Sequence, residues 1–392
     1  MFPEFNQYSI PLLILVIQGY VFAGLLLRRY FRKKHLPDLF LALLLAITAY
    51  QCTSYTIGFM GWYDTFRNTK VNYYLLDVNL LIGPVVYFYV RSITRPNQAF
   101  QRIDFWHFIP FLSWVSYELF VLIYDSLQPG FQDEQNGWWL KNIDFIYVAP
   151  FQLLLGYFSK ILYFAFSIQI YWNYRRRIQS YFSNTYRVEL NWIRNFLLIY
   201  CIALFLLQVT FEIIEETIIR LHWTQSFWVF LATAITAYYL GMQGYFRDIS
   251  ALFALTGKTE VSTTLQPSSP EKDPTPQGAN YQRLEKLMIE RQPYLESDLT
   301  LGDLAQQMGI PSNQLSQLIN SHLDMNFNDY INRYRVEAIK QSIRAGEHQR
   351  KSLLGIALDC GFNSKATFNR TFKKFTHTSP SAYAKKISDQ HP

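Results

Sequence analysis

Long apolar stretches alternate with short polar ones over the first two thirds of the chain. Seven of them come close to the ~20 residues that a helix needs to cross ~30 Å of hydrocarbon. They lie near residues 9–27, 39–60, 75–91, 105–124, 150–174, 191–214 and 224–246. This pattern predicts seven membrane-spanning helices. The basic cluster follows the first stretch instead of preceding it, so we do not expect that stretch to be a cleaved signal peptide.

After residue 280 the apolar positions recur at the spacing of amphipathic helices in water. The first such helix has one apolar stripe, made of Leu301, Leu304, Ala305 and Met308. Thr300 can cap this helix, with Asp303 at the reciprocal position. Gly309 predicts a tight turn, and Pro311 suits the first position of a second helix. The second helix is expected to bury Leu315, Leu318 and Ile319. Helix, short turn and helix is the helix-turn-helix pattern.

The same pattern recurs between residues 354 and 375. Ala357 and Gly361 are four residues apart, as are Ala305 and Gly309 in the first unit. The small alanine lets two helices approach, and the glycine permits the bend. Between the units, residues 326–345 are long enough for a connecting helix of about 30 Å. We therefore expect two helix-turn-helix units joined by one helix.

Composition separates the same two parts. Residues 1–256 hold 34 charged side chains, whereas the last 112 residues hold 26. Between them, residues 257–280 contain four prolines and no aromatic residue, which is typical of a solvated linker. The predicted fold is all-α: a seven-helix transmembrane bundle (1–250), a flexible linker (251–280) and a soluble domain (281–388). Three cysteines exclude a disulfide scaffold.

Lys and Arg residues predict the orientation of the bundle. The loops after the first, third and fifth stretches hold twelve of them, and the opposite loops hold four. Because basic loops stay in the cytoplasm, we expect the amino terminus outside and everything after residue 246 inside. The expected location is the cytoplasmic (inner) membrane.

Several ionisable residues lie within the apolar stretches, among them Asp77, Glu118, Lys160 and Glu212. Charges at membrane depth usually face a bundle interior or a cavity. They are therefore candidates for a ligand pocket or proton relay in which Lys160 pairs with one of the acids. A structural ion pair, or a lysine reaching towards the interface, explains them as well. The Gly83-Pro84 pair predicts a bend in the third helix.

The carboxy-terminal motifs resemble a known family. IALDCGFNSKATFNRTFKKFTHTSPSAY (356–383) closely resembles the signature of the AraC-type (AraC/XylS) bacterial transcription regulators, and NFNDYINRYRVEAIKQSI (326–343) resembles their linker helix. The resemblance covers roughly 105 residues. It implies that the two units bind double-stranded DNA in successive major grooves. LLIGPVVYFYVRSI (80–93) and WHFIPF (106–111) are similar to a subgroup with a seven-helix membrane domain.

Two positions depart from the pattern of that family. Pro311 stands where Ser or Thr is often the helix cap, and His377 stands where Gly is usual in a turn. Histidine tolerates positive φ better than most residues, so we expect the turn to survive.

The face opposite each apolar stripe predicts the DNA-binding residues, and the resemblance places base contacts on these same faces. Asn and Gln can pair with adenine, and Arg with guanine. The predicted DNA-binding residues are Asn313, Ser316, Gln317, Lys365, Ala366, Asn369, Arg370 and Lys373. The predicted DNA-contacting helix of the first unit has no Lys or Arg between residues 311 and 320. Since phosphate attraction dominates affinity, we expect the second unit to supply most of the salt-dependent binding.

Motifs of catalysis are missing from the sequence. The seven histidines show no metal-ligand spacing, and Cys360 lies on a buried face. There is no serine elbow and no kinase signature. We expect no catalytic residue, no metal, no cofactor and no enzymatic activity.

Three hypotheses follow for the whole chain. The first is a membrane-embedded sensor in which a small-molecule or envelope signal acts through the seventh helix, with control by proximity or homodimerisation because the linker is flexible. The second is a transporter-like protein with an attached regulatory domain. The third is a passive membrane anchor for a DNA-binding domain.

Overall fold

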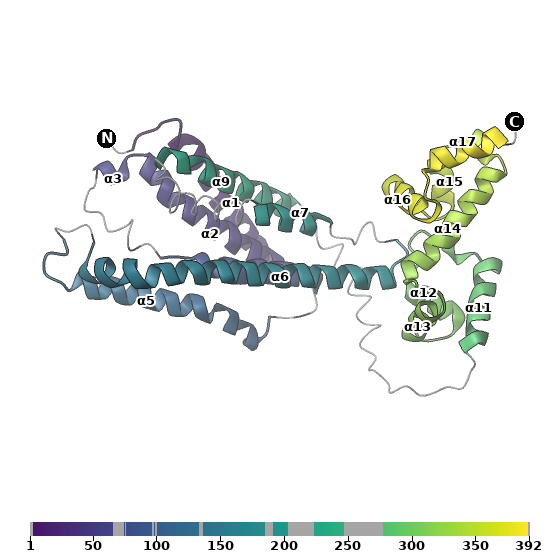
Figure 1. Cartoon of the computed structure of the whole chain (residues 1–392), viewed down its shortest axis with the longest axis horizontal. Helices are drawn as coiled ribbons and strands as arrows, with labels where there is room; N and C mark the ends of the chain where they lie inside the picture. Colours follow the sequence, from purple (N-terminus) through teal and green to yellow (C-terminus); the bar gives the residue numbers. More distant parts are fainter. Residues whose placement is uncertain are drawn as a thin grey trace. The chain divides into compact units, whose positions relative to one another are not determined.

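The computed structural model describes residues 3–65, 74, 76–95, 98, 100–132, 136–184, 191–202, 223–246 and 277–390. Within these residues the chain is helical and forms no β-strand, which confirms the all-α prediction (Figure 1). The chain divides into two compact units. One comprises Met1–Tyr171 with Asn191–Phe253, and the other comprises Trp172–Leu190 with Ala254–Pro392.

The first unit contains long apolar helices. Its helical elements, with α6 continuing into the second unit, are α1 (Ser9–Lys33), α2 (Leu36–Phe59), α3 (Trp62–Thr65), α4 (Asn79–Thr94), η2 (Arg102–Phe108), α5 (Ile109–Ser126), η3 (Leu140–Val148), α6 (Ala149–Tyr181), α7 (Asn191–Ile199) and α9 (Trp223–Phe246). Four stretches of the described residues are long and apolar enough to span a membrane: Ser9–Lys33, Leu36–Phe59, Arg102–Ser126 and Leu140–Tyr181. Much of the sixth predicted span (191–214) lies outside the described residues.

A half-buried arginine, Arg29, holds three helix ends together at one end of this unit. Arg29 near the end of α1 donates to both carboxylate oxygens of Asp38 at the start of α2, at 2.7 and 2.5 Å. The same guanidinium donates to the carbonyls of Gly244 and Tyr245 near the end of α9, at 2.9 and 2.6 Å. The ends of α1 and α9 therefore meet beside the start of α2.

The opposite ends of these helices also meet. The Asn6 side-chain amide, before α1, donates to the carbonyl of Phe59 at the end of α2 at 2.8 Å. The Tyr8 ring lies edge-on to the ring of Phe227, near the start of α9, at 5.1 Å. Helices α1 and α9 therefore run in the same direction, and α2 runs against them.

Gly83 lets α6 pack closely on α4. A Cβ at this position would lie 2.9 Å from a ring carbon of Tyr163 and 3.2 Å from the carbonyl oxygen of Ser159. Pro84 follows inside α4, and the helix continues to Thr94. The Gly-Pro pair thus serves helix packing, in addition to any bend.

The second unit carries the amphipathic helices. They are α11 (Gln277–Glu290), η5 (Pro293–Leu295), α12 (Leu301–Met308), α13 (Ser312–Leu323), α14 (Phe327–Arg344), η6 (Glu347–Gln349), α15 (Leu353–Asp359), α16 (Lys365–Thr376) and α17 (Pro380–Gln390). Helix α11 begins four residues inside the predicted linker, and residues 251–276 lie outside the described residues.

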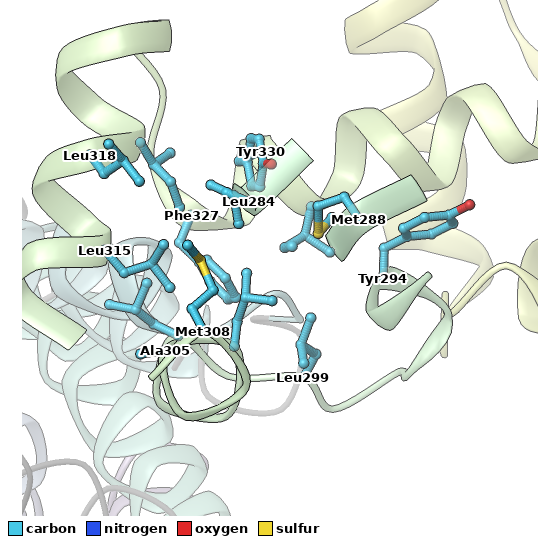
Figure 2. Packing of buried hydrophobic residues seen from close by; sticks show 14 residues of the cluster. Leu284, Met288, Tyr294, Leu299, Ala305, Met308, Leu315, Leu318, Phe327 and Tyr330 are labelled. Atoms are coloured by element: carbon cyan, nitrogen blue, oxygen red, sulfur yellow. The ribbon is translucent and has the colours of Figure 1, made fainter. Parts of the chain in front are cut away.

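One hydrophobic core includes the first part of α14, and a second core includes the rest of this helix. The first core, drawn in Figure 2, comprises Leu284, Met288, Tyr294, Leu299, Leu301, Leu304, Ala305, Met308, Leu315, Leu318, Ile319, Phe327, Tyr330 and Ile331. The second comprises Val336, Ile339, Ile343, Ile356, Ala357, Cys360, Phe362, Phe368, Phe372 and Ala384. Because α14 contributes to both cores, it fixes the two helix-turn-helix units to each other, as predicted for a connecting helix.

Candidate nucleic-acid interface

The first helix-turn-helix unit consists of α12 and α13. The Thr300 hydroxyl accepts from the Asp303 amide at 3.2 Å, and the Asp303 carboxylate accepts from the Thr300 amide at 2.9 Å. Gly309 ends α12 with φ at +69°. The predicted capping box, turn and buried stripe are therefore confirmed. Pro311 is the cap residue, as the family resemblance implied, so α13 begins at Ser312, one residue later than the sequence pattern predicted.

The second helix-turn-helix unit consists of α15 and α16 and is built in the same way. Ser352 caps α15 by accepting from the Gly355 amide at 3.1 Å, and Gly361 follows the helix with φ at +88°. Ser364 caps α16. His377 ends α16 with φ at +58°, so the predicted left-handed turn forms without glycine.

The second helix of each unit turns its polar face outwards. On α13, Asn313, Gln317 and Asn320 are exposed and Ser316 is half-buried. On α16, the exposed residues are Lys365, Ala366, Asn369, Arg370 and Lys373. The leucines, isoleucine and phenylalanines between them are buried. The eight predicted DNA-binding residues thus lie on the accessible faces of α13 and α16, and their contacts with DNA stay predictions.

The basic residues of α16 differ in their partners. Lys374 forms an ion pair with Asp329 of α14 at 2.6 Å. Lys365 and Lys373 extend from the exposed face. Lys374 therefore helps to hold α16 on the connecting helix, a role that the sequence pattern did not predict.

A buried arginine, Arg335, lies on α14 between the two helix-turn-helix units. Arg335 is 1% exposed, and its Nε donates to the carbonyl of Tyr294 while Nη2 donates to that of Glu296, both at 2.7 Å. Its guanidinium lies 5.8 Å from the ring centroid of Phe362, beside Gly361. Burial lowers the pKa of Arg335 to about 10, so the side chain remains charged at neutral pH.

Arg335 was not predicted from the sequence either, although a signal for it existed. It lies four residues after Ile331 and four before Ile339, so helical spacing places it on the buried face of α14. An arginine on such a face is a marker of a specific buried hydrogen-bond arrangement.

The candidate residues of the membrane unit form a partial cluster. The Asp77 amide donates to both carboxylate oxygens of Glu118, at 2.9 and 3.1 Å, and the Gln152 side chain donates to Asp77 at 2.5 Å. Lys160 is 6% exposed, and its Nζ lies 5.8 Å from the ring centroid of Tyr157. Glu212 lies outside the described residues. No group of His, Cys, Asp or Glu suited to a metal ion occurs in the part of the chain that the structure describes.

Comparison with known proteins finds a family and relatives for the carboxy-terminal part of the chain. Residues 304–386 match the family described as a helix-turn-helix domain. The chain is 33% identical over 90 residues to an uncharacterized HTH-type transcriptional regulator of Staphylococcus aureus (strain COL), covering 23% of this chain and 12% of that protein. It is 28% identical over 104 residues to the HTH-type transcriptional regulator CdhR of Pseudomonas aeruginosa, covering 26% of this chain and 30% of that protein.

These relatives are therefore matched over only a minor part of their length. No solved structure matches the chain. The findings establish an AraC-type helix-turn-helix domain at the carboxy terminus, of the kind found in DNA-binding transcription regulators.

Proposed function

We propose that this protein is a membrane-bound, sequence-specific DNA-binding transcription regulator that senses a signal through its transmembrane domain. One observation carries the DNA-binding part of the proposal. Helix α13 has an accessible polar face and α16 has an accessible polar and basic face. Both helices pack on the same helix, α14. Two recognition helices fixed to one rod suit two major-groove contacts on one face of a duplex.

Base preference is expected from the amide side chains of α13 and from Asn369 and Arg370 of α16. The test is a selection from random duplex oligonucleotides with the full chain in lipid nanodiscs. Arg370→Ala should weaken binding and relax the preference at one base position, whereas Lys286→Ala on α11, outside both units, should do neither. Equal loss of affinity on every sequence would make Arg370 a phosphate contact. Failure of the wild type to select any sequence would overturn the proposed function.

We further propose that the chain lies in the cytoplasmic membrane with its amino terminus outside and the DNA-binding domain in the cytoplasm. The alternating directions of α1, α2 and α9 and the basic residues at one set of loops support this orientation. In a variant whose native cysteines are replaced by serine, Gln132→Cys should react with a membrane-impermeant maleimide on intact cells. Lys33→Cys should react only after permeabilisation. The reverse pattern would invert the orientation.

The sensing part rests on the polar side chains within the bundle. Asp77 is hydrogen-bonded to both Glu118 and Gln152, and Lys160 is buried on α6, eight residues after Gln152. Buried polar groups at membrane depth usually serve a ligand, an ion or a proton. Lys160→Met and Glu118→Gln should change expression of the target gene in cells. If both variants regulate it as the wild type does, the bundle is only an anchor.

A further inference from the structure

The residues that directly follow α6 belong to the same compact unit as the helix-turn-helix domain. The Ser183 amide donates to the carbonyl of Leu299 at 3.2 Å, and the Ser183 hydroxyl donates to the same oxygen at 2.6 Å. Phe182 forms an isolated antiparallel bridge with Thr300. Since Thr300 caps α12, this short segment is attached at the start of the first helix-turn-helix unit. We call residues 181–183 the clamp segment.

The connecting helix α14 holds the clamp segment from its other side. The Asn328 side-chain amide donates to the carbonyls of Phe182 and Ser183, at 3.2 and 2.8 Å. Asn332, which is 2% exposed, donates to the Asn328 side-chain oxygen at 3.0 Å. This second bond fixes the orientation of the Asn328 amide, so that its nitrogen faces the two carbonyls.

Ser183 also completes the surroundings of the buried Arg335. Nη1 donates to the Ser183 carbonyl at 3.4 Å, and Nη2 donates to the Ser183 hydroxyl at 3.2 Å. The other acceptors are the carbonyls of Tyr294 and Glu296. A buried guanidinium is tolerated only when its N–H groups are hydrogen-bonded. Ser183 is itself 1% exposed, so it is an integral part of this arrangement.

A glycine makes room for the remaining clamp residue. Tyr181 packs against the first core, and a Cβ on Gly302, the second residue of α12, would lie 3.1 Å from its hydroxyl. Each residue of the clamp segment therefore meets a complementary feature of α12, α14 or the turn before α12. The attachment uses specific hydrogen bonds to buried groups and is not a general apolar contact.

We propose that the clamp segment holds the start of α12 and the middle of α14 in the arrangement that binds DNA, so that its displacement lowers DNA affinity. The clamp segment contacts α12 of the first helix-turn-helix unit and also Arg335, which lies against Gly361 of the second, so it touches groups of both units. The clamp segment is continuous with α6, which lies within Leu140–Tyr181, a stretch long and apolar enough to span a membrane. A change in the membrane bundle thus has a route to the DNA-binding helices that does not pass through residues 251–280. This inference rests on the proposed function.

The first test uses the full chain in lipid nanodiscs and the duplex that the wild type selects. Ser183→Ala and Asn328→Ala should speed amide exchange at residues 183 and 299–303 by about tenfold or more, and weaken DNA binding to a similar degree, because hydrogen bonds to buried or charged groups are worth that much. Ser180→Ala is the matched control, since among the described residues that hydroxyl bonds to the Arg177 carbonyl of its own helix and to no group of α12 or α14. Wild-type affinity in both clamp variants would overturn the proposal.

The second test is a disulfide between Phe182→Cys and Thr300→Cys, two positions paired across an antiparallel bridge and therefore close enough to link. We expect the bond to form and the oxidised protein to bind DNA at least as tightly as the same variant when reduced. Absence of the bond, or weaker binding on oxidation, would overturn the proposal. Cross-linking and amide exchange do not involve DNA. A clamp that forms in a chain selecting no sequence would therefore refute the proposed function and leave the attachment established.

Discussion

Gly309 and Gly361 occupy the same turn position in the two helix-turn-helix units, but only Gly361 is enclosed. Both have positive φ, +69° and +88°. A Cβ on Gly309 would meet nothing within 4 Å. A Cβ on Gly361 would lie 2.5 Å from the Tyr294 carbonyl oxygen and 2.8 Å from Nε of Arg335. The second turn therefore packs directly on the groups that hold the buried arginine.

Alanine at these two positions should therefore have unequal effects. Gly309→Ala should lower the free energy of unfolding by about 1 kcal/mol, the cost of a left-handed conformation with a side chain. Gly361→Ala should lower it by roughly 3 kcal/mol, because overlap with backbone and Arg335 adds a packing cost. Hydrogen exchange of α12 to α16 in the full chain measures both. Equal losses would mean that the enclosure of Gly361 has no energetic consequence.

Cys360 should be chemically inert in the folded protein. It is 6% exposed in the second core, and burial raises its pKa from 9.0 to about 11. The thiolate, which is the reactive form, is then scarce at pH 8. Iodoacetamide should modify Cys360 at least tenfold more slowly in the native protein than in urea, as measured by peptide mass spectrometry. Similar rates in both states would place the thiol in contact with water.

The same raised pKa makes the carboxy-terminal unit sensitive to alkali. Well below pH 9 the thiol is protonated in both the folded and the unfolded state, so this group does not make stability depend on pH there. As pH rises towards 11, the unfolded chain loses the proton and the folded one retains it, so stability falls. Cys360→Ser should reduce this loss between pH 9 and 11, since a hydroxyl does not ionise there. An unchanged profile would exclude the thiol as its source.

Local features of the helix-turn-helix units were predictable from the sequence because neighbouring residues determine them. The Thr300 cap and the Gly309 turn each depend on residues within a few positions, and the buried stripes follow the period of the helix. The start of α13 was predicted one residue too early: proline favours the first helical position, but here Pro311 is the cap, the position that the family resemblance implied.

Contacts between residues far apart in the chain could not be predicted in this way. Ser183 and Arg335 are 152 positions apart, and Lys374 and Asp329 are 45 apart. Periodicity places Arg335 on the buried face of α14 but does not say which groups accept its hydrogen bonds. In the same way, Asp77 and Glu118 were recognised as unusual, and their direct hydrogen bond became known only from the fold.

Two adjacent lysines of α16 should differ in their effect on salt-dependent DNA binding. Lys373 is exposed, whereas Lys374 is paired with Asp329 at 2.6 Å. Lys373→Ala should reduce the slope of log affinity against log salt concentration by about 1, the value for one phosphate contact. Lys374→Ala should reduce it by clearly less, because this ammonium group is already partly neutralised. Titrations between 50 and 200 mM salt would decide, and a larger effect of Lys374→Ala would show that the ion pair opens on DNA.

Among the basic residues at the end of α1, Arg29 should be the one whose replacement lowers the stability of the protein most. Its side chain is 21% exposed and that of Asp38 is 2% exposed, so Arg29→Ala leaves a buried carboxylate without its bidentate partner. It also removes the donor to the Gly244 and Tyr245 carbonyls. Breaking such a pair typically costs about 3 kcal/mol, which should appear as a clear fall in the thermal unfolding temperature in nanodiscs.

Two further variants separate the ion pair from the loss of positive charge. Lys33→Ala removes an exposed charge from the last turn of the same helix and should leave the unfolding temperature nearly unchanged. The double variant Arg29→Met/Asp38→Leu should recover much of the stability lost in Arg29→Ala, because apolar side chains of similar size can replace a buried pair. If the double variant were as unstable as Arg29→Ala, the carbonyls at the end of α9 would be the more important partners of Arg29, and the guanidinium would act chiefly as a bridge between α1 and α9.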